Sequence, residues 1–384
     1  MRVTLTSRIF SPEPAAASFR LAALADALAG AGNDVTVLTS TVPGGGAPST
    51  RPAVRVKRFP VLRDRAGYVR GYAQYMSFDI PLFFRLLLIG RTDVVVTEPP
   101  PTTGAVVRLA CLLRGTPYAY YAADIWSDAA EATGAPRWVV RGVRMLELFA
   151  LRGSAAVLSV SEGVSQRLAE LGVRDRVTLI GNGVDTDLFG LGSGRADGVS
   201  PYLVYAGTAS EVHGAGIFLD AFARVVPGRP GTRLVFIGQG ADREAIERAA
   251  RALPPGSVHF EPRLTPEAVA DWLGGASASL ASVRPGQGYD FSFPTKMYAA
   301  VACGTPVIYA GVGPGQAFTR EGGVGEGVDY EVEAVAAAME RALDAGPTPA
   351  RRARIREWAA ANVGSAAVTQ RAVDAVTAAA AQTR

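Results

Sequence analysis

Lysine, histidine and cysteine are scarce in this chain of 384 residues. The two cysteines, Cys111 and Cys303, lie in apolar segments of different halves, which predicts buried free thiols in a reducing cytoplasm. The two histidines, His213 and His259, leave few ligands for a zinc site, so we expect no metal and no bound cofactor. His259 lies in the middle of a strand pattern and is expected in the core.

Long apolar runs and signal features are also lacking. No apolar run reaches the roughly 18 to 20 residues that span a bilayer. The N-terminus, MRVTLTSRIF, leads directly into a strand pattern and does not have the layout of a signal peptide. We therefore expect a cytoplasmic protein.

The net charge of +4 is too small to indicate a nucleic-acid partner, but the charge is unevenly distributed. Residues 51–91 contain nine basic and two acidic residues, interleaved with tyrosine and phenylalanine. This composition suits the surface of an anionic membrane. It equally suits a solvated face over an ordinary core helix. Peripheral contact of residues 51–91 with the inner face of a membrane is thus one of two open interpretations.

Glycine is missing where two common nucleotide sites require it. The turn after the first strand pattern reads SRIFSPEPAAASF (7–19), without the G-x-G-x-x-G of a dinucleotide-binding fold. GQG at 238–240 also lacks the full spacing, and the chain has no G-x-x-x-x-G-K-[ST] phosphate loop. These absences argue against nicotinamide binding and against ATP hydrolysis of the P-loop type.

Strand patterns alternate with helix patterns along most of the chain. Near-continuous apolar strands between helices predict parallel sheets that are buried on both faces. The pattern stops at the Gly- and Ser-rich residues 186–200 and then restarts, which predicts an α/β fold with two doubly wound domains facing each other across a cleft. The predicted strands are residues 3–7, 34–40, 93–98, 118–124, 155–161, 176–182, 202–207, 233–238, 258–262, 278–282 and 305–311.

The predicted domains follow from the break in this pattern. We expect a Rossmann-like first domain (1–188), a linker (189–200) and a Rossmann-like second domain (201–362). A C-terminal helix (363–384) is expected to pack back on the first domain.

Lys296 is one of only two lysines, the other being Lys57. The stretch FSFPTKMYAAVACGTPVI (291–308) predicts a helix that stops at Gly304, followed by a strand. Lys296 would lie in the first turn, where the helix dipole disfavours a cation. The side chain is therefore either solvated on a surface turn or placed beside an anion.

Several turns together resemble glycosyltransferase family 4, whose two-domain architecture is called GT-B. The resemblance covers about residues 1–345. Within the family, PTKMY and ADIWSD look most similar to the branch that transfers N-acetylated amino sugars in polysaccharide assembly. The motifs are FSPE (10–13), NDVTVLTS (33–40), ADIWSD (123–128), NGVD (182–185), YAGT (205–208), IGQG (237–240) and PTKMYAAVACGTPVI (294–308).

The resemblance implies transfer of a sugar from a nucleotide donor with retention at the anomeric carbon and without a bound metal. Lys296 and free N–H groups at Thr295 and Met297 would then receive the diphosphate. Asp124, at the end of a buried strand, would receive an acceptor hydroxyl or stabilise the sugar ring, although it could equally cap a turn. The residues implied for the donor are Gly207, Thr208, Gly238, Arg263, Arg284, Asp290, Pro294, Thr295, Lys296 and Met297. Those implied for the acceptor are Glu13, Ser18, Arg20 and Trp126.

The chain departs from the family at positions that normally hold the donor. Ala299 and Phe291 stand where members carry two glutamates, the second of which accepts hydrogen bonds from the ribose. Thr208 and His213 stand where members carry a phosphate-binding arginine and lysine. Asp290, Arg263 and Arg284 are expected to substitute for these missing groups.

The resulting interpretation is a glycosyltransferase that moves a sugar, such as an N-acetylated hexosamine, from a UDP-sugar to a sugar or lipid-linked acceptor. Two alternatives remain open at the level of sequence. One is a non-catalytic relic that serves as a binding subunit, which the missing carboxylates favour. The other is a sugar-nucleotide epimerase of the same architecture, which would need more acids and histidines around the sugar than this chain offers.

Overall fold

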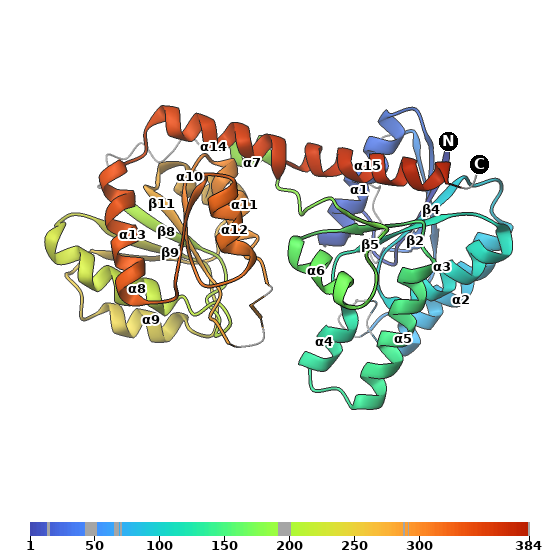
Figure 1. Cartoon of the computed structure of the whole chain (residues 1–384), viewed down its shortest axis with the longest axis horizontal. Helices are drawn as coiled ribbons and strands as arrows, with labels where there is room; N and C mark the ends of the chain where they lie inside the picture. Colours follow the sequence, from blue (N-terminus) through green and yellow to red (C-terminus); the bar gives the residue numbers. More distant parts are fainter. Residues whose placement is uncertain are drawn as a thin grey trace. The chain divides into compact units, whose positions relative to one another are not determined.

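The chain forms two compact units (Figure 1). The computed structural model describes residues 1–13, 16–42, 52–64, 69, 71–190, 201–286, 289–290 and 292–382. Unit 1 comprises Met1–Gly181 together with Val368–Arg384, and unit 2 comprises Asn182–Ala367. Each unit is built on one parallel sheet, so the predicted α/β fold with two doubly wound domains is confirmed.

The seven-stranded sheet of unit 1 has the order β3-β2-β1-β4-β5-β6-β7. All its neighbouring strands pair in parallel. The strand order reverses between β1 and β4, and this reversal is where ligands of such sheets bind. The strands are β1 (Arg2–Thr6), β2 (Asp34–Ser40), β3 (Val54–Phe59), β4 (Val94–Thr97), β5 (Tyr118–Ala122), β6 (Ala156–Ser159) and β7 (Val177–Leu179).

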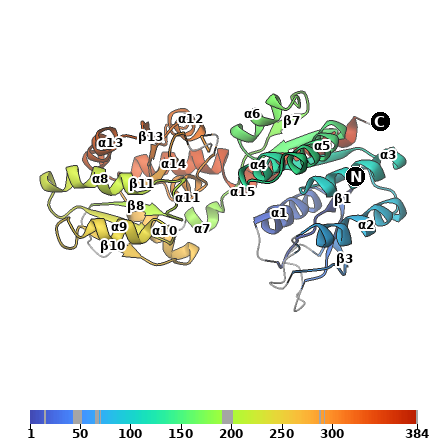
Figure 2. The ribbon, with the colours of Figure 1, turned by 90° about the horizontal axis from the view of Figure 1, so that it is seen from below.

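Helices cover both faces of this sheet because its strands are apolar on both sides. Val94 and Val96 of β4 pack with α1 and α15, whereas Val95 packs with α2, α3 and α5 on the opposite face. The views from two directions agree with these two layers (Figures 1 and 2). The helices are α1 (Ala16–Gly30), α2 (Tyr72–Leu88), α3 (Pro101–Arg114), α4 (Trp126–Ala132), α5 (Arg137–Gly153), α6 (Glu162–Glu170) and α15 (Ser365–Ala381).

The six-stranded sheet of unit 2 has the order β10-β9-β8-β11-β12-β13, again entirely parallel. Its order reverses between β8 and β11. The strands are β8 (Tyr202–Ala206), β9 (Arg233–Ile237), β10 (Val258–Glu261), β11 (Ala278–Ser282), β12 (Val307–Ala310) and β13 (Gly325–Val328).

The helices of unit 2 also form two layers. Side chains of α8, α9 and α13 pack with Tyr205 and Phe236 on one face, and those of α10, α11 and α14 pack with Val204 and Val235 on the other. The helical elements are α7 (Thr186–Gly190), α8 (Gly216–Val225), the 3₁₀ turn η1 (Val226–Gly228), α9 (Arg243–Ala250), α10 (Pro266–Gly275), α11 (Lys296–Ala302), α12 (Pro314–Glu321), α13 (Val332–Ala345) and α14 (Pro349–Asn362).

The last helix, α15, completes the core of unit 1. Its side chains Val373, Val376 and Ala379 are buried with those of α1, β1 and β4. The guanidinium of Arg371 donates to the carbonyl of Ile180 at 2.9 and 2.8 Å, which fixes the start of the packed segment. The core of unit 1 is therefore built from both ends of the chain.

Two details concern the scarce residues. Cys111 and Cys303 are free and buried, as predicted, and burial raises the pKa of each thiol to about 12. His259 was expected in the core, which is wrong, because β10 is the edge strand of its sheet and leaves the ring exposed. The ring instead lies 3.0 Å from the carboxylate of Glu261.

Candidate functional site

Lys296 is the first residue of α11, the seven-residue helix that follows β11. Its ammonium is buried and has no hydrogen-bond partner among the described residues. Nζ lies 3.8 Å from the centre of the Tyr205 ring, at the end of β8. Lys296 therefore reaches the carboxyl edge of the sheet at the point where the strand order reverses. An unpaired buried cation is costly, so an anion beside Nζ would stabilise it.

The electrostatics around Lys296 agree with its burial. Desolvation lowers the pKa of Lys296 to about 7. The pKa of His213 is lowered to about 4, by burial first and by the nearby Lys296 second. The imidazole Nδ1 of His213 lies 2.7 Å from the hydroxyl of Ser210. Near neutral pH His213 is therefore uncharged. Lys296 is the side chain at this edge of the sheet whose charge changes near pH 7.

Glycines form a closely packed backbone wall beside Lys296. Gly207 has φ +143°, and a Cβ there would lie 3.0 Å from Cε of Lys296. At Gly238, with φ +124°, a Cβ would lie 2.4 Å from the carbonyl oxygen of Gly207. At Gly240, with φ +148°, it would lie 1.9 Å from that of Ala209. Glycine is needed at each position because both the conformation and the close approach exclude a side chain.

The sequence also placed Thr295 and Met297 at this site as free N–H donors. For Met297 that expectation is wrong, because its N–H donates to the carbonyl of Pro294 at 3.0 Å and its side chain is fully buried in the core. Thr295 is exposed and Pro294 is buried at the start of α11.

The other expected donor residues lie in loops of unit 2. Thr208 and Arg263 are exposed. Arg284 is exposed too. Burial raises the pKa of the Tyr330 hydroxyl, and the nearby guanidinium of Arg284 opposes this rise. Asp290 accepts a hydrogen bond from the N–H of Gly286 at 3.0 Å, so one of its carboxylate oxygens caps the loop. Phe291 lies outside the described residues.

Unit 1 holds a second buried polar group at its own reversal point. Glu98 follows β4 and accepts a hydrogen bond of 2.5 Å from the hydroxyl of Ser7, which follows β1. The guanidinium of Arg20, on α1, lies 3.6 Å from the other carboxylate oxygen and stacks over the Tyr121 ring at 4.9 Å. Burial raises the pKa of Glu98, and Arg20, Ser7 and Arg8 oppose this rise.

Several polar atoms of this group lack partners among the described residues. They are Nε of Arg20, Nε of Arg8 and the hydroxyl of Ser18, all buried. Asp124 lies two residues beyond the end of β5 and is exposed. Desolvation nevertheless raises the pKa of its carboxyl, with Arg20 opposing. The expected residues Ser18, Arg20 and Asp124 thus lie at one edge of one sheet.

Trp126 is the first residue of α4, and its backbone is fixed by a hydrogen bond to a buried side chain. The buried carboxylate of Glu147 accepts from the N–H groups of Trp126 at 2.7 Å and Ser127 at 3.1 Å, which stabilises the start of this helix. The Trp126 ring meets the Tyr75 ring edge-on at 6.2 Å, and the guanidinium of Arg8 lies 4.2 Å from the centre of the Tyr75 ring.

Glu13 is placed differently from the other expected acceptor residues. Its carboxylate forms a bidentate pair with Arg63, at 2.9 and 3.2 Å, and both side chains are largely covered. Arg63 also donates to the carbonyl of Thr41 at 2.7 Å. Glu13 therefore ties the loop after β1 to the segment after β3.

Two family sequence profiles together match most of the chain. Residues 16–183 match the glycosyl transferase 4-like domain, and residues 200–345 match glycosyl transferases group 1. The chain is a family 4 glycosyltransferase of the GT-B fold. No curated protein sequence matches it.

Solved structures share the fold of this glycosyltransferase at low sequence identity. Sucrose-phosphate synthase from Thermosynechococcus elongatus is 20% identical, with a TM-score of 0.67, and 96% of each chain is covered. Anabaena Alr3699/HepE in complex with UDP is 15% identical, with a TM-score of 0.71, covering 98% of this chain and 99% of the other. A UDP-N-acetylglucosamine 2-epimerase described as putative, from Listeria monocytogenes, is 15% identical, with a TM-score of 0.59, covering 98% and 95%.

Sequence reasoning missed three residues that the glycosyltransferase places at these edges. Glu98, Arg8 and Tyr205 were read as parts of strands and turns. Glu98 could have been found, because an acid that ends an apolar strand beside the first strand must lie at the reversal point of the sheet. Arg8 carries no comparable pattern in the sequence. Tyr205 opens the YAGT motif, but nothing in that motif indicates its contact with Lys296.

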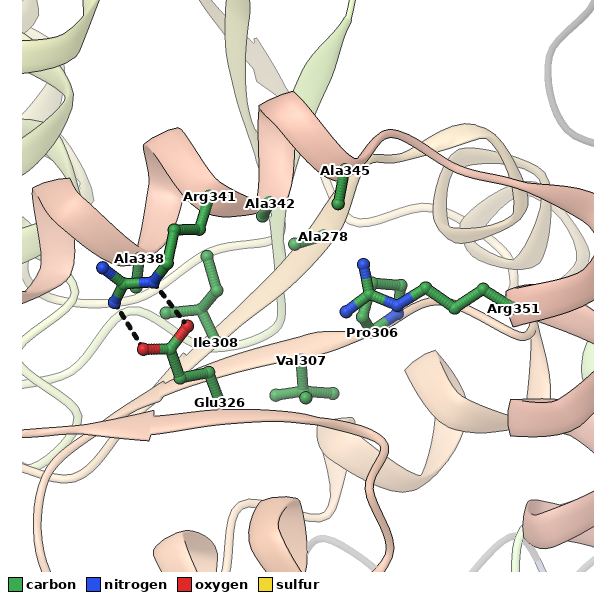
Figure 3. Close-up of a pocket in the computed structure, with 11 residues that line it drawn as sticks. Ala278, Pro306, Val307, Ile308, Glu326, Ala338, Arg341, Ala342, Ala345 and Arg351 are labelled. Atoms are coloured by element: carbon green, nitrogen blue, oxygen red, sulfur yellow. Dashed lines mark hydrogen bonds and ion pairs between the residues drawn. The ribbon is translucent and has the colours of Figure 1, made fainter.

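A pocket of about 200 Å³ lies elsewhere in unit 2 (Figure 3). It is lined by the first residues of β11, β12 and β13 and by α13, so it opens at the amino edge of the sheet, opposite Lys296. Within it Arg341 is paired with Glu326, and Arg351 extends toward Pro306. This pocket is separate from the candidate site of the glycosyltransferase.

In the part of the chain that the structure describes, no group of three or more His, Cys, Asp or Glu side chains could hold a metal ion. Among the described helices of the glycosyltransferase, none is both long enough and apolar enough to cross a bilayer.

Proposed function

We propose that unit 2 binds a UDP-sugar with its diphosphate against the ammonium of Lys296. The observation that carries the proposal is the buried Nζ, which has no hydrogen-bond partner among the described residues and lies at the reversal point of the sheet. A diphosphate there would supply the missing acceptors and restore the charge that burial disfavours. Gly207 lets the Lys296 side chain lie against the backbone at this edge, because a Cβ there would meet the lysine.

The same contact serves the chemistry. When the bond between the sugar C1 and the diphosphate oxygen breaks, negative charge builds on the departing UDP. A fixed ammonium that faces this oxygen stabilises that charge more strongly in the transition state than in the bound donor, which accelerates the reaction. We propose that Lys296 provides this stabilisation without a metal, with retention at C1 as the family resemblance implies.

Unit 1 supplies the acceptor side of the proposal. Its unpartnered Ser18 hydroxyl and Arg20 Nε, together with Asp124, are suited to bind a hydroxyl-bearing acceptor. The raised pKa of Asp124 makes its carboxylate a better base for the proton that the attacking hydroxyl loses. Trp126 offers a ring on which a sugar can stack. The acceptor is proposed to be a sugar, either small or lipid-linked.

The donor proposal draws on two further points. The related Anabaena structures were determined with UDP, with UDP and glucose, and with UDP-glucose, which supports a uridine nucleotide. The PTKMY and ADIWSD motifs favour an N-acetylated hexosamine as the sugar. Asp290 is the carboxylate proposed to replace the first missing glutamate, through the oxygen that does not cap the loop.

The decisive test compares the two lysines of the chain. Wild type, Lys296→Met and the surface control Lys57→Met are titrated with UDP. They are then incubated with UDP-glucose or UDP-N-acetylglucosamine and a panel of sugar acceptors while released UDP and products are measured. We expect Lys296→Met to weaken UDP binding about tenfold or more, because a charge-assisted hydrogen bond contributes roughly 1.5–3 kcal/mol. Lys57→Met should leave binding unchanged. Equal affinity of wild type and Lys296→Met would exclude Lys296 from the donor site.

A further inference from the structure

Helices α2, α3 and α5 form one layer of unit 1, and their outward sides are unusually apolar. Nine of the fourteen large apolar side chains that are exposed in the described part of the chain lie on these three helices. They include Leu88, at 85% exposure, and Leu112, at 74%. Monomeric soluble proteins rarely gather such side chains in one area unless it contacts a partner.

The exposed side chains form stripes rather than scattered positions. On α2 they are Tyr72, Ile80, Phe84 and Leu88, the last three spaced four residues apart, and on α3 they are Leu109, Leu112 and Leu113. Residues at these spacings share one side of a helix. Side chains of α2, α3 and α5 also pack into a common core beneath the sheet, so the three outward sides adjoin (Figure 1).

Most of the charged side chains on this layer are arginines. The helices contain seven arginines and only two acids, Asp79 and Glu147. Both acids are buried on the inner side, where Asp79 accepts from Thr103 and Glu147 accepts from the start of α4. Arg144 is paired with acids of α4. The outward side therefore presents exposed arginines such as Arg137 and Arg141 without an acid from these helices.

We propose that this surface, the outward side of α2, α3 and α5, binds an anionic lipid bilayer, and we call it the docking face. Apolar side chains would enter the boundary between headgroups and acyl chains while arginines meet lipid phosphates. The absence of outward acids on these three helices favours lipid over a second copy of the chain. A two-fold symmetric contact would bring the arginines of one copy against those of the other.

The docking face differs from the contact that the basic composition of residues 51–91 suggested. Within that range, only α2 contributes to the face. Arg55 is paired with Asp34, and Arg63 with Glu13, so these charges are engaged elsewhere in unit 1. The inference is independent of the proposed donor site because it concerns α2, α3 and α5 alone.

Binding to vesicles tests the proposal without any substrate. Wild-type protein is floated with vesicles of phosphatidylcholine alone or mixed with phosphatidylserine, and we expect it to bind the anionic vesicles. The double variant Leu88→Gln/Leu112→Gln should bind about tenfold more weakly or worse, because it removes two apolar insertions. The matched control is Leu179→Gln on β7, where the leucine is 43% exposed outside the docking face, and it should bind like wild type.

A second pair of variants tests the charge. Arg137→Gln/Arg141→Gln should weaken binding to anionic vesicles about tenfold or more, since each arginine near such a surface contributes about fivefold. Arg233→Gln/Arg251→Gln in unit 2 changes the same net charge at exposed arginines outside the face, and should have little effect. Equal losses in both pairs would show that net charge alone drives binding and would overturn the docking face.

Trp138, which is 76% exposed on α5, reports where the contact occurs. Anionic vesicles should shift the tryptophan fluorescence of wild type to shorter wavelength, and Trp138→Phe should lose this shift while still floating with the vesicles. An unchanged shift in Trp138→Phe would place the contact elsewhere and refute the proposal. Failure of the wild-type protein to float with anionic vesicles would also refute the proposal. A dimer in light scattering that Leu88→Gln/Leu112→Gln dissociates would refute it too, because the docking face would then bind a second copy of the chain.

Discussion

The affinity of the glycosyltransferase for a UDP-sugar should fall as the pH rises through 7. Burial lowers the pKa of Lys296 to about 7 in the unliganded protein. A diphosphate against Nζ favours the ammonium and raises that pKa on binding. Binding is then coupled to proton uptake above about pH 7, so the affinity is highest below this pH and lost above it.

The size of this loss of affinity follows from the fraction of the unliganded protein in which Lys296 is protonated. With a pKa of about 7, that fraction falls from about nine tenths at pH 6 to about one tenth at pH 8. The affinity for UDP-glucose should therefore be about tenfold weaker at pH 8 than at pH 6. His213, with a pKa of about 4, is already neutral across this range and does not contribute.

Isothermal titration with UDP-glucose at several pH values measures the effect. UDP-glucose is preferred to UDP because its diphosphate has no terminal phosphate that titrates near pH 6. Lys296→Met should bind weakly at every pH, and Lys296→Arg should show no fall because a guanidinium stays charged. A wild-type affinity that is constant or rises between pH 6 and 8 would refute the coupling of Lys296 to the diphosphate.

The same pKa predicts a stability effect with a defined sign. Between pH 7 and 10.5 the unfolded chain keeps the Lys296 proton that the folded chain has lost. The free energy of unfolding should therefore rise with pH across this window, by at most about 1.4 kcal/mol per unit. Lys296→Met should abolish this contribution, and urea unfolding of both proteins at several pH values checks it.

The remaining predictions concern the scaffold. Gly240→Ala should destabilise unit 2 by about 3 kcal/mol or more in urea unfolding, because the new Cβ meets a carbonyl oxygen at 1.9 Å; Gly228→Ala, with no atom within 4 Å of its Cβ, should not. Glu147→Ala should cost about 2–4 kcal/mol by leaving the partly buried N–H of Trp126 and the buried N–H of Ser127 without an acceptor, and Glu147→Gln, which keeps one acceptor, should cost less. Arg371→Met should cost about 1–3 kcal/mol and speed amide hydrogen exchange in α15, since it removes both hydrogen bonds to Ile180; unchanged exchange would contradict this role.

The alternation of apolar strands and helices was enough to predict the fold. Strands such as β4 and β12 are buried on both faces, which leaves a continuous apolar signal that only a parallel sheet between helix layers explains. Helix α2 was harder to predict. Pro81 lies inside it and argues against a helix, yet Phe78, Leu82 and Leu86 are buried at helical spacing.

Without the family resemblance, the candidate site was predictable only where a residue type was unusual for its position. Lys296 stood out because a cation began an apolar helix, and the structure places its ammonium inside unit 2. The Met297 N–H could not be assigned correctly, because whether a first-turn amide is free depends on the path of the preceding proline. The role of Glu13 as a partner of Arg63 was equally invisible, since the two residues are 50 positions apart in the sequence.

The contribution of α15 to the core of unit 1 has a consequence for synthesis. Residues that complete this core are translated only after the whole of unit 2, which is one uninterrupted segment, Asn182–Ala367. The half of the protein that is translated first should therefore finish folding last, after its neighbour. A change that displaces α15 would then damage unit 1 rather than unit 2, which α15 follows in the sequence.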